Sequence, residues 1–427
     1  MKKYINTDRK SWDEILKRPL FEVSELYGKV QTVLDDIKKN GDEALLKYTL
    51  QFDKVQLNSL SVSEKELEEA EQAVSMELKD AISVAAENIK IFHSAQKPSL
   101  HKIETAAGVT CWQKAVPIEK VGLYIPGGTA PLFSTVLMLA LPAQIAGCKE
   151  IVLCSPPNKE GKINPAILYA AKVAGVTKIF KLGGVQAIGA MAYGTETVPG
   201  TYKIFGPGNQ FVMAAKQLVS MNDVSMDMPA GPSEVLVVAD ESSNPAFVAS
   251  DLLSQAEHGI DSQVVLVCNN TFIAEKVEQE LIEQLNLLPR KEIAEKALEH
   301  SILIIQESKQ EMIDLINSYA PEHLIINTKN YWEIAEKITN AGSVFLGEFT
   351  PESAGDYASG TNHTLPTNGW ARSYSGVNLD SFLKKITFQE ITNEGIKNIG
   401  PAIEVMAAAE QLDAHKNAVT LRLKKNH

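Results

Sequence analysis

The stretch EVLVVADESSNPAFVASDLLSQAEHGIDSQVVLVC, residues 234–268, contains the pattern that most clearly indicates the fold class. It begins with EVLVVA and ends with QVVLVC, two short runs of apolar and β-branched residues that predict buried strands. Between them, Asn244 offers a helix cap and Pro245 a first-turn proline, so a helix is predicted to begin there. A strand, a helix and a second strand in this order predict a parallel βαβ unit.

The same alternation runs through the chain from residue 119. Strands are predicted at KVGLYI, EIVLC, KIFKL, EVLVVA, QVVLVC, ILIIQ, HLIIN and SVFLG. Helix-length segments such as NPAILYAAKVAG separate several of them. About eight strands of this kind predict two parallel sheets, each covered by helices on both faces. Residues 8–105 are predicted to be helical, residues 349–376 form a long loop without periodicity, and a helical tail follows from Pro401.

Composition excludes several classes of protein. The chain has 427 residues, 44% of them hydrophobic and 22% charged, which fits a globular protein of more than one domain. A net charge of −12 argues against a nucleic-acid binder. We expect no secretory signal and no membrane span, because the most apolar run, VLMLALPA, is too short and contains a proline. Four scattered cysteines indicate neither a disulfide framework nor a thiolate metal site, and a cytoplasmic protein fits best.

The familiar nucleotide and hydrolase motifs are missing from this sequence. There is no G-x-G-x-x-G, Walker loop, H-E-x-x-H or G-x-S-x-G. Glycine-rich turns follow predicted strands at residues 124–128, 182–189 and 205–209. Such turns let a backbone approach a phosphate or a ring, but they also occur in any α/β protein. A dinucleotide site, if present, must therefore be of unusual design.

One polar pair lies at the end of an otherwise apolar helix. Gln255 and His258 are three residues apart, so they share a helical face that continues the inward stripe. Gly259 is predicted to close this helix. The pair fits a capped helix with two satisfied polar groups as well as it fits half of a metal site.

Further candidates lie at element boundaries and in the long loop. Glu322 and His323 place a carboxylate next to an imidazole where a strand is predicted to start. The pair fits general base chemistry, but it also fits a histidine at a helix end with a solvated neighbour. The loop carries Asp356 and His363, and the tail carries His415. Gln255, His258, Asp356 and His415 would together offer two nitrogens and two oxygens to zinc, but spacing alone does not assemble them.

Several longer motifs resemble the histidinol dehydrogenase family. They are VGLYIPGGTAPLFST, FGPGN, DMPAGPSEVLVVAD, SQAEHG, APEHL, ESAGDYASGTNHTLPT and LDAHKNAVTLR, in family order from residue 119 to the C-terminus. With the compatible N-terminal region, the resemblance covers essentially the whole chain. It implies NAD-dependent oxidation of L-histidinol to L-histidine through L-histidinaldehyde, with two NAD and one zinc ion per site.

The resemblance also implies roles for individual residues. Glu322 and His323 would be the catalytic acid/base pair. The zinc ligands would be Gln255, His258, Asp356 and His415. The substrate would contact these ligands and His323, together with Ser233, His363 and Glu410. Tyr124, Gln186 and Asn209 would line the NAD site.

The implied architecture is an α/β homodimer of two Rossmann-like domains whose C-terminal tails are exchanged, so that the active sites are shared. We expect a helical region at 1–118, an NAD-side domain at 119–232, a zinc and substrate domain at 233–380 with the loop 349–376, and a dimer-crossing tail at 381–427. Partners would be a small-molecule substrate and a second copy, with no nucleic acid and no membrane. Two alternatives remain: a paralogue that oxidises another small alcohol, such as a sulfonated diol, and a non-enzymatic metal- or nucleotide-binding protein.

Overall fold

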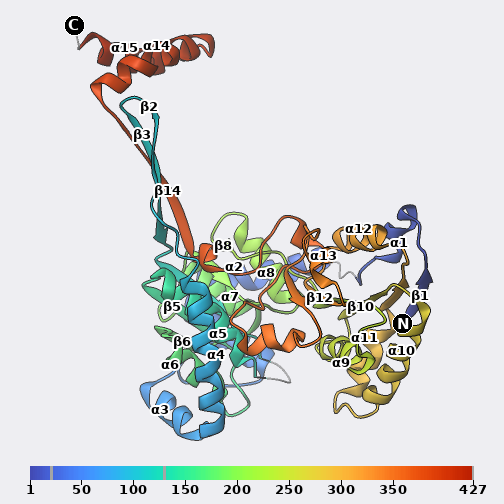
Figure 1. Cartoon of the computed structure of the whole chain (residues 1–427). Helices are drawn as coiled ribbons and strands as arrows, with labels where there is room; N and C mark the ends of the chain where they lie inside the picture. The colour runs from blue at the N-terminus through green and yellow to red at the C-terminus, as the bar shows by residue number, and fades with distance from the viewer. Residues whose placement is uncertain (20–22, 128–130, 426–427) are drawn as a thin grey trace.

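The computed structural model describes residues 1–19, 23–127 and 131–425. Two parallel sheets form the body of the molecule (Figure 1). The first has the order β6-β5-β4-β7-β8 and consists of β4 (Lys120–Tyr124), β5 (Glu150–Ser155), β6 (Lys178–Lys181), β7 (Lys203–Phe205) and β8 (Ser225–Met226). The second has the order β1-β11-β10-β9-β12-β13 and consists of β1 (Lys2–Ile5), β9 (Glu234–Ala239), β10 (Gln263–Cys268), β11 (Ile302–Ile305), β12 (His323–Asn327) and β13 (Ser343–Leu346).

The two sheets repeat one topology. Apart from β1, each sheet places its five strands in the spatial order 3-2-1-4-5, counted along its own stretch of chain. Strand order therefore reverses between β4 and β7 in one sheet and between β9 and β12 in the other. The predicted fold class, α/β with two Rossmann-like parallel sheets, is confirmed.

Helices cover both faces of each sheet, which is why the central strands are apolar over most of their length. Against the first sheet pack α2 (Tyr27–Tyr48), α7 (Gly184–Tyr193) and α8 (Gln210–Ser220) on one face, and α3 (Glu64–Ala73), α4 (Met76–Ser94), α5 (Phe133–Ala146) and α6 (Pro165–Val173) on the other. Against the second pack α9 (Pro245–Ala256), α10 (Thr271–Leu285) and α11 (Lys291–Glu299) on one face, and α1 (Trp12–Ile15), α12 (Lys309–Tyr319) and α13 (Tyr331–Ala335) on the other.

All eight strands predicted from the sequence are present, but other predictions need correction. Residues 8–105 are not helical throughout, because Lys102–Ala106 forms strand β2. Residues Lys2–Ile5, which fall in the region 1–118 predicted to be helical, instead form strand β1, which pairs in parallel with β11 of the second sheet. Helix α9 ends at Ala256, not at Gly259, so His258 lies in the turn after the helix.

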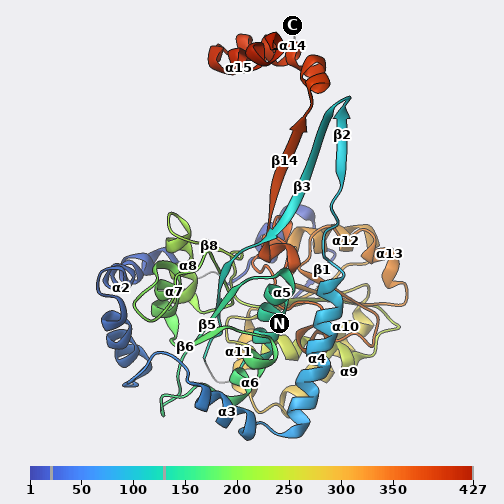
Figure 2. The same ribbon diagram turned by 90° about the vertical axis from the view of Figure 1, so that its left-hand side faces the viewer.

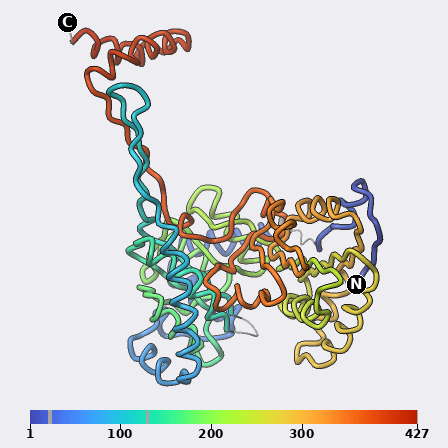
Figure 3. The backbone as a smooth tube through the Cα atoms, in the orientation of Figure 1, coloured from blue at the N-terminus to red at the C-terminus, as the bar shows by residue number. Residues whose placement is uncertain are grey.

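The C-terminal tail projects from the body on a narrow arm. Strand β14 (Leu383–Ile391) pairs with β3 (Val109–Pro117), which in turn pairs with β2 in an antiparallel sheet. Beyond this sheet lie α14 (Asn393–Ala409) and α15 (Asp413–Lys424), which pack on one another (Figures 1 and 3). The tail helix begins before Pro401, which lies inside α14. No helix in the described part of the chain is long and apolar enough to cross a membrane.

Chain direction decides which groups meet at the edges of the second sheet. In a parallel α/β unit, each helix runs antiparallel to its strands, so the C-terminal end of the helix lies beside the amino ends of the strands. The end of α9 therefore lies at the same edge as the first residues of β9 and β12. This geometry brings the regions of Gln255 and His323 to one edge.

Candidate active site and nucleotide pocket

Glu322 and His323 lie at the amino end of the central strands of the second sheet. His323 is the first residue of β12 and pairs with Val235 of β9. The backbone N–H of Glu234 donates to Oε2 of Glu322 at 2.8 Å, and the carbonyl of Glu234 lies 3.3 Å from Nδ1 of His323. A proton on Nδ1 can be donated to this carbonyl, which leaves Nε2 free to accept a proton.

This position departs from the usual rule for open α/β sheets, in which ligands bind beyond the carboxyl ends of the strands. Here the acid/imidazole pair is at the opposite edge, as the sequence reading of a strand starting at His323 indicated. The long loop supplies the remaining groups at that edge, since Nε2 of His323 lies 3.6 Å from Oδ1 of Asp356.

Three side chains in this region can hold a metal ion. Ligand atoms of His258, Glu352 and Asp356 all lie within 4.8 Å of one another. Glu352 was missed in the sequence, although it lies four residues before Asp356. Because residues 354–358 form a helical turn, positions 352 and 356 fall on one face. That i, i+4 spacing of two carboxylates was the available signal.

Gln255 supports the same interpretation. Its side chain is fully buried, yet neither Oε1 nor Nε2 forms a hydrogen bond with any residue that the structure describes. A buried amide left without partners costs roughly 1–3 kcal/mol, so such a group indicates a missing ligand. The oxygen and nitrogen donors of this cluster fit zinc, and less selectively manganese or cobalt.

The electrostatics of the cluster follow from its buried carboxylates. Burial lowers the pKa of His323, but Glu352 and Glu322 outweigh it and hold that pKa well above its ordinary value. Burial raises the pKa of Glu352 well above the ordinary range. The pKa of Asp356 is lowered, because hydrogen bonding and charge at His323 outweigh the effect of burial. The cluster thus combines excess negative charge with poor hydration, which favours a cation.

His363 connects the long loop to the first sheet's helices. Its Nε2 lies 3.1 Å from Oγ1 of Thr135 in α5, and its Nδ1 lies 3.0 Å from the carbonyl of Asp356. Burial lowers the pKa of His363. Ser233 lies directly before β9, where it lines a small cavity with Arg18 and Glu234. Both predicted substrate residues therefore border the same edge of the second sheet.

The two predicted site residues of the tail are not brought to this cluster within one chain. Glu410 ends α14 and His415 lies in α15, and both side chains are exposed. Figure 2 shows these helices at the far end of the arm, well away from α9 in the body, and Figure 1 shows the same separation from β12. Within a single chain, Glu410 and His415 are therefore separate from Gln255, His258 and Asp356.

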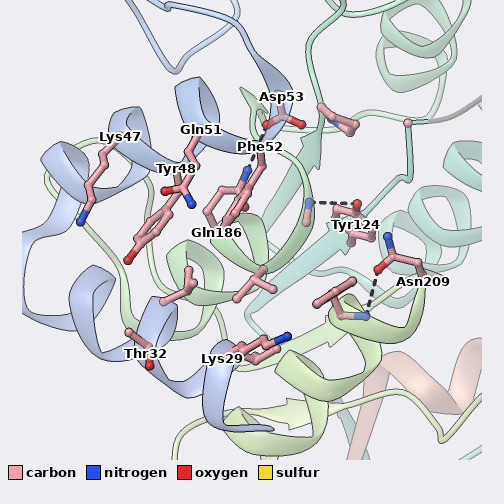
Figure 4. Close-up of a pocket in the computed structure, with 17 residues that line it drawn as sticks. Lys29, Thr32, Lys47, Tyr48, Gln51, Phe52, Asp53, Tyr124, Gln186 and Asn209 are labelled. Carbon is pink, nitrogen blue, oxygen red and sulfur yellow. Dashed lines mark hydrogen bonds between the residues drawn. The ribbon is translucent and has the colours of Figure 1, made fainter. Parts of the chain in front are cut away.

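A second site lies at the carboxyl end of the first sheet, where its strand order reverses. A pocket of about 750 Å³ is lined by Tyr124, Gln186 and Asn209 together with residues of α2 (Figure 4). The hydroxyl of Tyr124 accepts a hydrogen bond from the Gly184 backbone at 3.1 Å, and Asn209 caps α8. All three residues expected at an NAD site thus surround one cavity of suitable size.

Asp53 is a pocket residue that the sequence did not reveal. It ends the turn after α2, and its Oδ2 accepts a hydrogen bond from Nε2 of Gln186 at 3.0 Å (Figure 4). Burial raises the pKa of Asp53 to about 6, despite this bond. No motif surrounds Asp53, so only the packing of α2 on α7 could identify it.

A buried ion pair supports the wall of this pocket. Gly206, which follows β7, has φ +121°, and an added Cβ would lie 2.1 Å from the carbonyl of Tyr124. Nζ of Lys216 donates to the carbonyl of Gly206 at 2.9 Å, and the backbone N–H of Gly206 donates to Oδ2 of Asp227 at 2.8 Å. Lys216 and Asp227 also pair with one another. Both backbone groups of Gly206 are thus fixed behind Tyr124 and close to Asn209.

A parallel sheet with a pocket of about 750 Å³ at its switch point, joined to a second sheet with a histidine and carboxylate cluster, is the arrangement expected of an enzyme of the dehydrogenase type. The family model described as histidinol dehydrogenase matches residues 16–423. The chain belongs to the histidinol dehydrogenase family.

Individual relatives agree with this assignment. A histidinol dehydrogenase of Bacteroides fragilis is 65% identical over 97% of both chains, and the chloroplastic histidinol dehydrogenase of Arabidopsis thaliana is 54% identical over 96% of this chain and 89% of its own. The crystal structure of histidinol dehydrogenase from Elizabethkingia anophelis superimposes with a TM-score of 0.98 at 57% identity, covering 100% of this chain and 98% of that chain. The alternative of a paralogue for another small alcohol is not favoured by these matches.

Proposed function

We propose that this chain oxidises L-histidinol to L-histidine through L-histidinaldehyde, in histidine biosynthesis, with two NAD and one zinc ion per site. The observation that carries the proposal is the buried His323, whose Nε2 faces a metal-ligand cluster in a chain of this family. The overall reaction removes four electrons from the substrate.

Gln255, His258 and Asp356 would hold the zinc ion from one chain, and His415 would hold it from a partner. Zinc is redox-inert, so it would position the substrate's amine and imidazole nitrogens rather than carry electrons. The unpaired amide of Gln255 and the short separations between His258, Glu352 and Asp356 support this assignment.

His323 would act as the base in the first oxidation. Its Nδ1 faces the carbonyl of Glu234, so its Nε2 can take the proton of the alcohol. This role needs a neutral imidazole. Two of the carboxylates that raise the pKa of His323, Glu352 and Asp356, lie in the proposed metal cluster, where the positive charge of a bound cation would oppose their effect. NAD would accept the electrons of each oxidation as hydride.

Glu322 would serve the second oxidation. It would take a proton from water as water adds to the aldehyde, while the protonated His323 returns its proton to the aldehyde oxygen. The neutral His323 would then take a hydroxyl proton of the hydrate as the second hydride leaves for NAD. The bond from the Glu234 backbone to Oε2 holds this carboxylate in place beside the imidazole. Burial of both side chains limits the access of other water to the aldehyde.

Tyr124, Gln186 and Asn209 would bind NAD, and Ser233, His363 and Glu410 would contact the substrate. We further propose a homodimer in which the tail of each chain delivers Glu410 and His415 to the other chain's site. The projecting arm supports this assembly, since Val405 and Met406 at its end are 70% and 64% exposed. We place the enzyme in the cytoplasm.

Incubation of the purified chain with L-histidinol and NAD tests the proposal. We expect two NADH for each L-histidine formed. His323→Gln should lower kcat by about 10²- to 10⁴-fold and leave the zinc content unchanged. A complete lack of NADH formation by the zinc-loaded chain would refute the function, while full activity of His323→Gln would refute only the role of His323.

A further inference from the structure

A buried arginine from the N-terminal segment lies behind the catalytic pair. Arg18 and Glu234 form an ion pair with side-chain exposures of only 13% and 2%. Nη2 of Arg18 donates to Oε1 of Glu234 at 3.1 Å and to the carbonyl of Tyr319 at 2.7 Å. The guanidinium also lies over the ring of Tyr319, 3.8 Å from its centroid. Arg18 therefore joins the start of β9 to the end of α12.

Both of these segments adjoin the proposed catalytic pair, Glu322 and His323. The backbone N–H of Glu234 binds the carboxylate of Glu322, and its carbonyl faces the imidazole of His323. Tyr319 precedes Glu322 by three residues, so the end of α12 sets the start of β12. Glu234 thus pairs with Arg18 through its side chain and contacts both proposed catalytic side chains through its backbone.

A further hydrogen bond closes the network. The hydroxyl of Tyr319 lies 3.0 Å from Oε2 of Glu234 and 2.9 Å from Oε1 of Gln263. Burial raises the pKa of Glu234, and the charge of Arg18 opposes that shift. A fully buried carboxylate needs such a partner, because an unpaired buried charge is strongly destabilising.

We infer that Arg18 is a positioning residue for the reaction, acting through Glu234 on the placement of Glu322 and His323. The inference rests on the proposed roles of these two residues. Among the described residues, Arg18 bonds to Glu234, Tyr319 and Ala320 rather than to Glu322 or His323, so its effect must pass through the backbone of residue 234. A displacement of about 1 Å in a reacting group can cost 10²-fold in rate.

Replacement of Arg18 by methionine tests this inference. We expect Arg18→Met to lower kcat by about 10- to 100-fold, with the zinc content and the affinity for NAD unchanged. Arg9 provides a matched control, because it pairs from the same N-terminal segment with Asp314 of the same helix α12, at the surface. Arg9→Met should keep kcat within about twofold. Equal losses in both variants would overturn the inference.

A double-mutant cycle separates positioning from general loss of stability. If Arg18 acts through His323, then Arg18→Met should cause little further loss of kcat in a His323→Gln background. A loss of the same factor in both backgrounds would overturn the inference. An unimpaired His323→Gln would instead overturn the proposed role of His323, so the two failures are distinguishable.

Should Arg18→Met fail to fold, two other variants carry the test. Arg18→Met/Glu234→Gln removes both buried charges and so avoids an unpaired carboxylate. Tyr319→Phe removes only the hydroxyl, which bonds to Glu234 and Gln263, and keeps the ring beneath Arg18. Both should fold and lower kcat without a change in zinc content, and wild-type kcat in both would overturn the inference.

Discussion

Nε2 of His323 lies 3.6 Å from Oδ1 of Asp356, so the imidazole of a β-strand meets a carboxylate of the long loop. The two residues are 33 positions apart, and the intervening chain leaves the sheet through β13 before it returns. This contact places the proposed base directly beside the proposed metal site.

Glu352 should contribute to metal binding. Glu352→Gln removes a negative charge from a buried cluster, so we expect zinc affinity to fall about 10- to 100-fold. Competition with a chromophoric chelator measures this affinity without reference to turnover. Glu348→Gln, an exposed substitution just before the same loop segment, is the matched control and should bind zinc as the unmodified chain does. Unchanged affinity of Glu352→Gln would contradict the prediction.

Removal of the metal should abolish turnover reversibly. Chelation followed by dialysis should stop NADH formation, and added zinc should restore it, because in the proposed mechanism the metal would hold the substrate by its nitrogens. Full activity of a chain shown to be metal-free by elemental analysis would rule out this model.

Mixing two inactive variants should restore activity if sites are shared. His258→Ala and His415→Ala each damage the metal site, but a mixed dimer would hold one doubly damaged and one intact site. Equal amounts that exchange at random should give about a quarter of the original activity. Mixed samples that stay inactive despite proven subunit exchange would show that His415 serves its own chain.

Asp53 should make stability depend on pH. Burial raises its pKa from 3.8 to about 6, so the folded chain binds its proton more tightly than the unfolded chain does. The folded state thus holds more protons between about pH 4 and pH 6, and this group's contribution to the free energy of unfolding falls as pH rises through that window.

Asp53→Asn should remove that fall. Between about pH 4 and pH 7, the melting temperature of Asp53→Asn should fall less with rising pH than that of the unmodified chain. Asp80→Asn, on the exposed surface of α4, is the control and should leave the profile unchanged. Parallel profiles for Asp53→Asn and the unmodified chain would contradict the assignment.

Lys216 should support NAD binding from behind the pocket. Lys216→Met leaves Asp227 buried without its partner, at a cost of about 3–5 kcal/mol, and frees the carbonyl of Gly206. We expect KM for NAD to rise more than kcat falls. Val219→Ala, a core substitution in the same helix, should lower stability while KM for NAD stays unchanged. A similar KM in both variants would contradict this role.

The regular elements of the body were predictable because their signals are local. The runs EVLVVA and QVVLVC are apolar on both faces, and a strand of a covered parallel sheet must be so. Asn244 and Pro245 begin α9 where the sequence indicated. Strands β2, β3 and β14 escaped prediction, because an exposed arm carries few buried residues and so little hydrophobic pattern. The short body strands β1, β7 and β8 also escaped, since two to four residues give no readable period.

The α/β class and the apolar strands follow from local sequence patterns, and the residues of the proposed site follow from long family motifs. The places of Glu352 and Asp53 in these sites, and of Arg18 behind the proposed catalytic pair, became visible only in the folded chain. The tertiary structure also separated Glu410 and His415 from the cluster within one chain. The physical reason is range: periodicity and caps are encoded within a few residues, whereas the contacts of Arg18 with Glu234 span 216 positions and exist only after the sheet has formed.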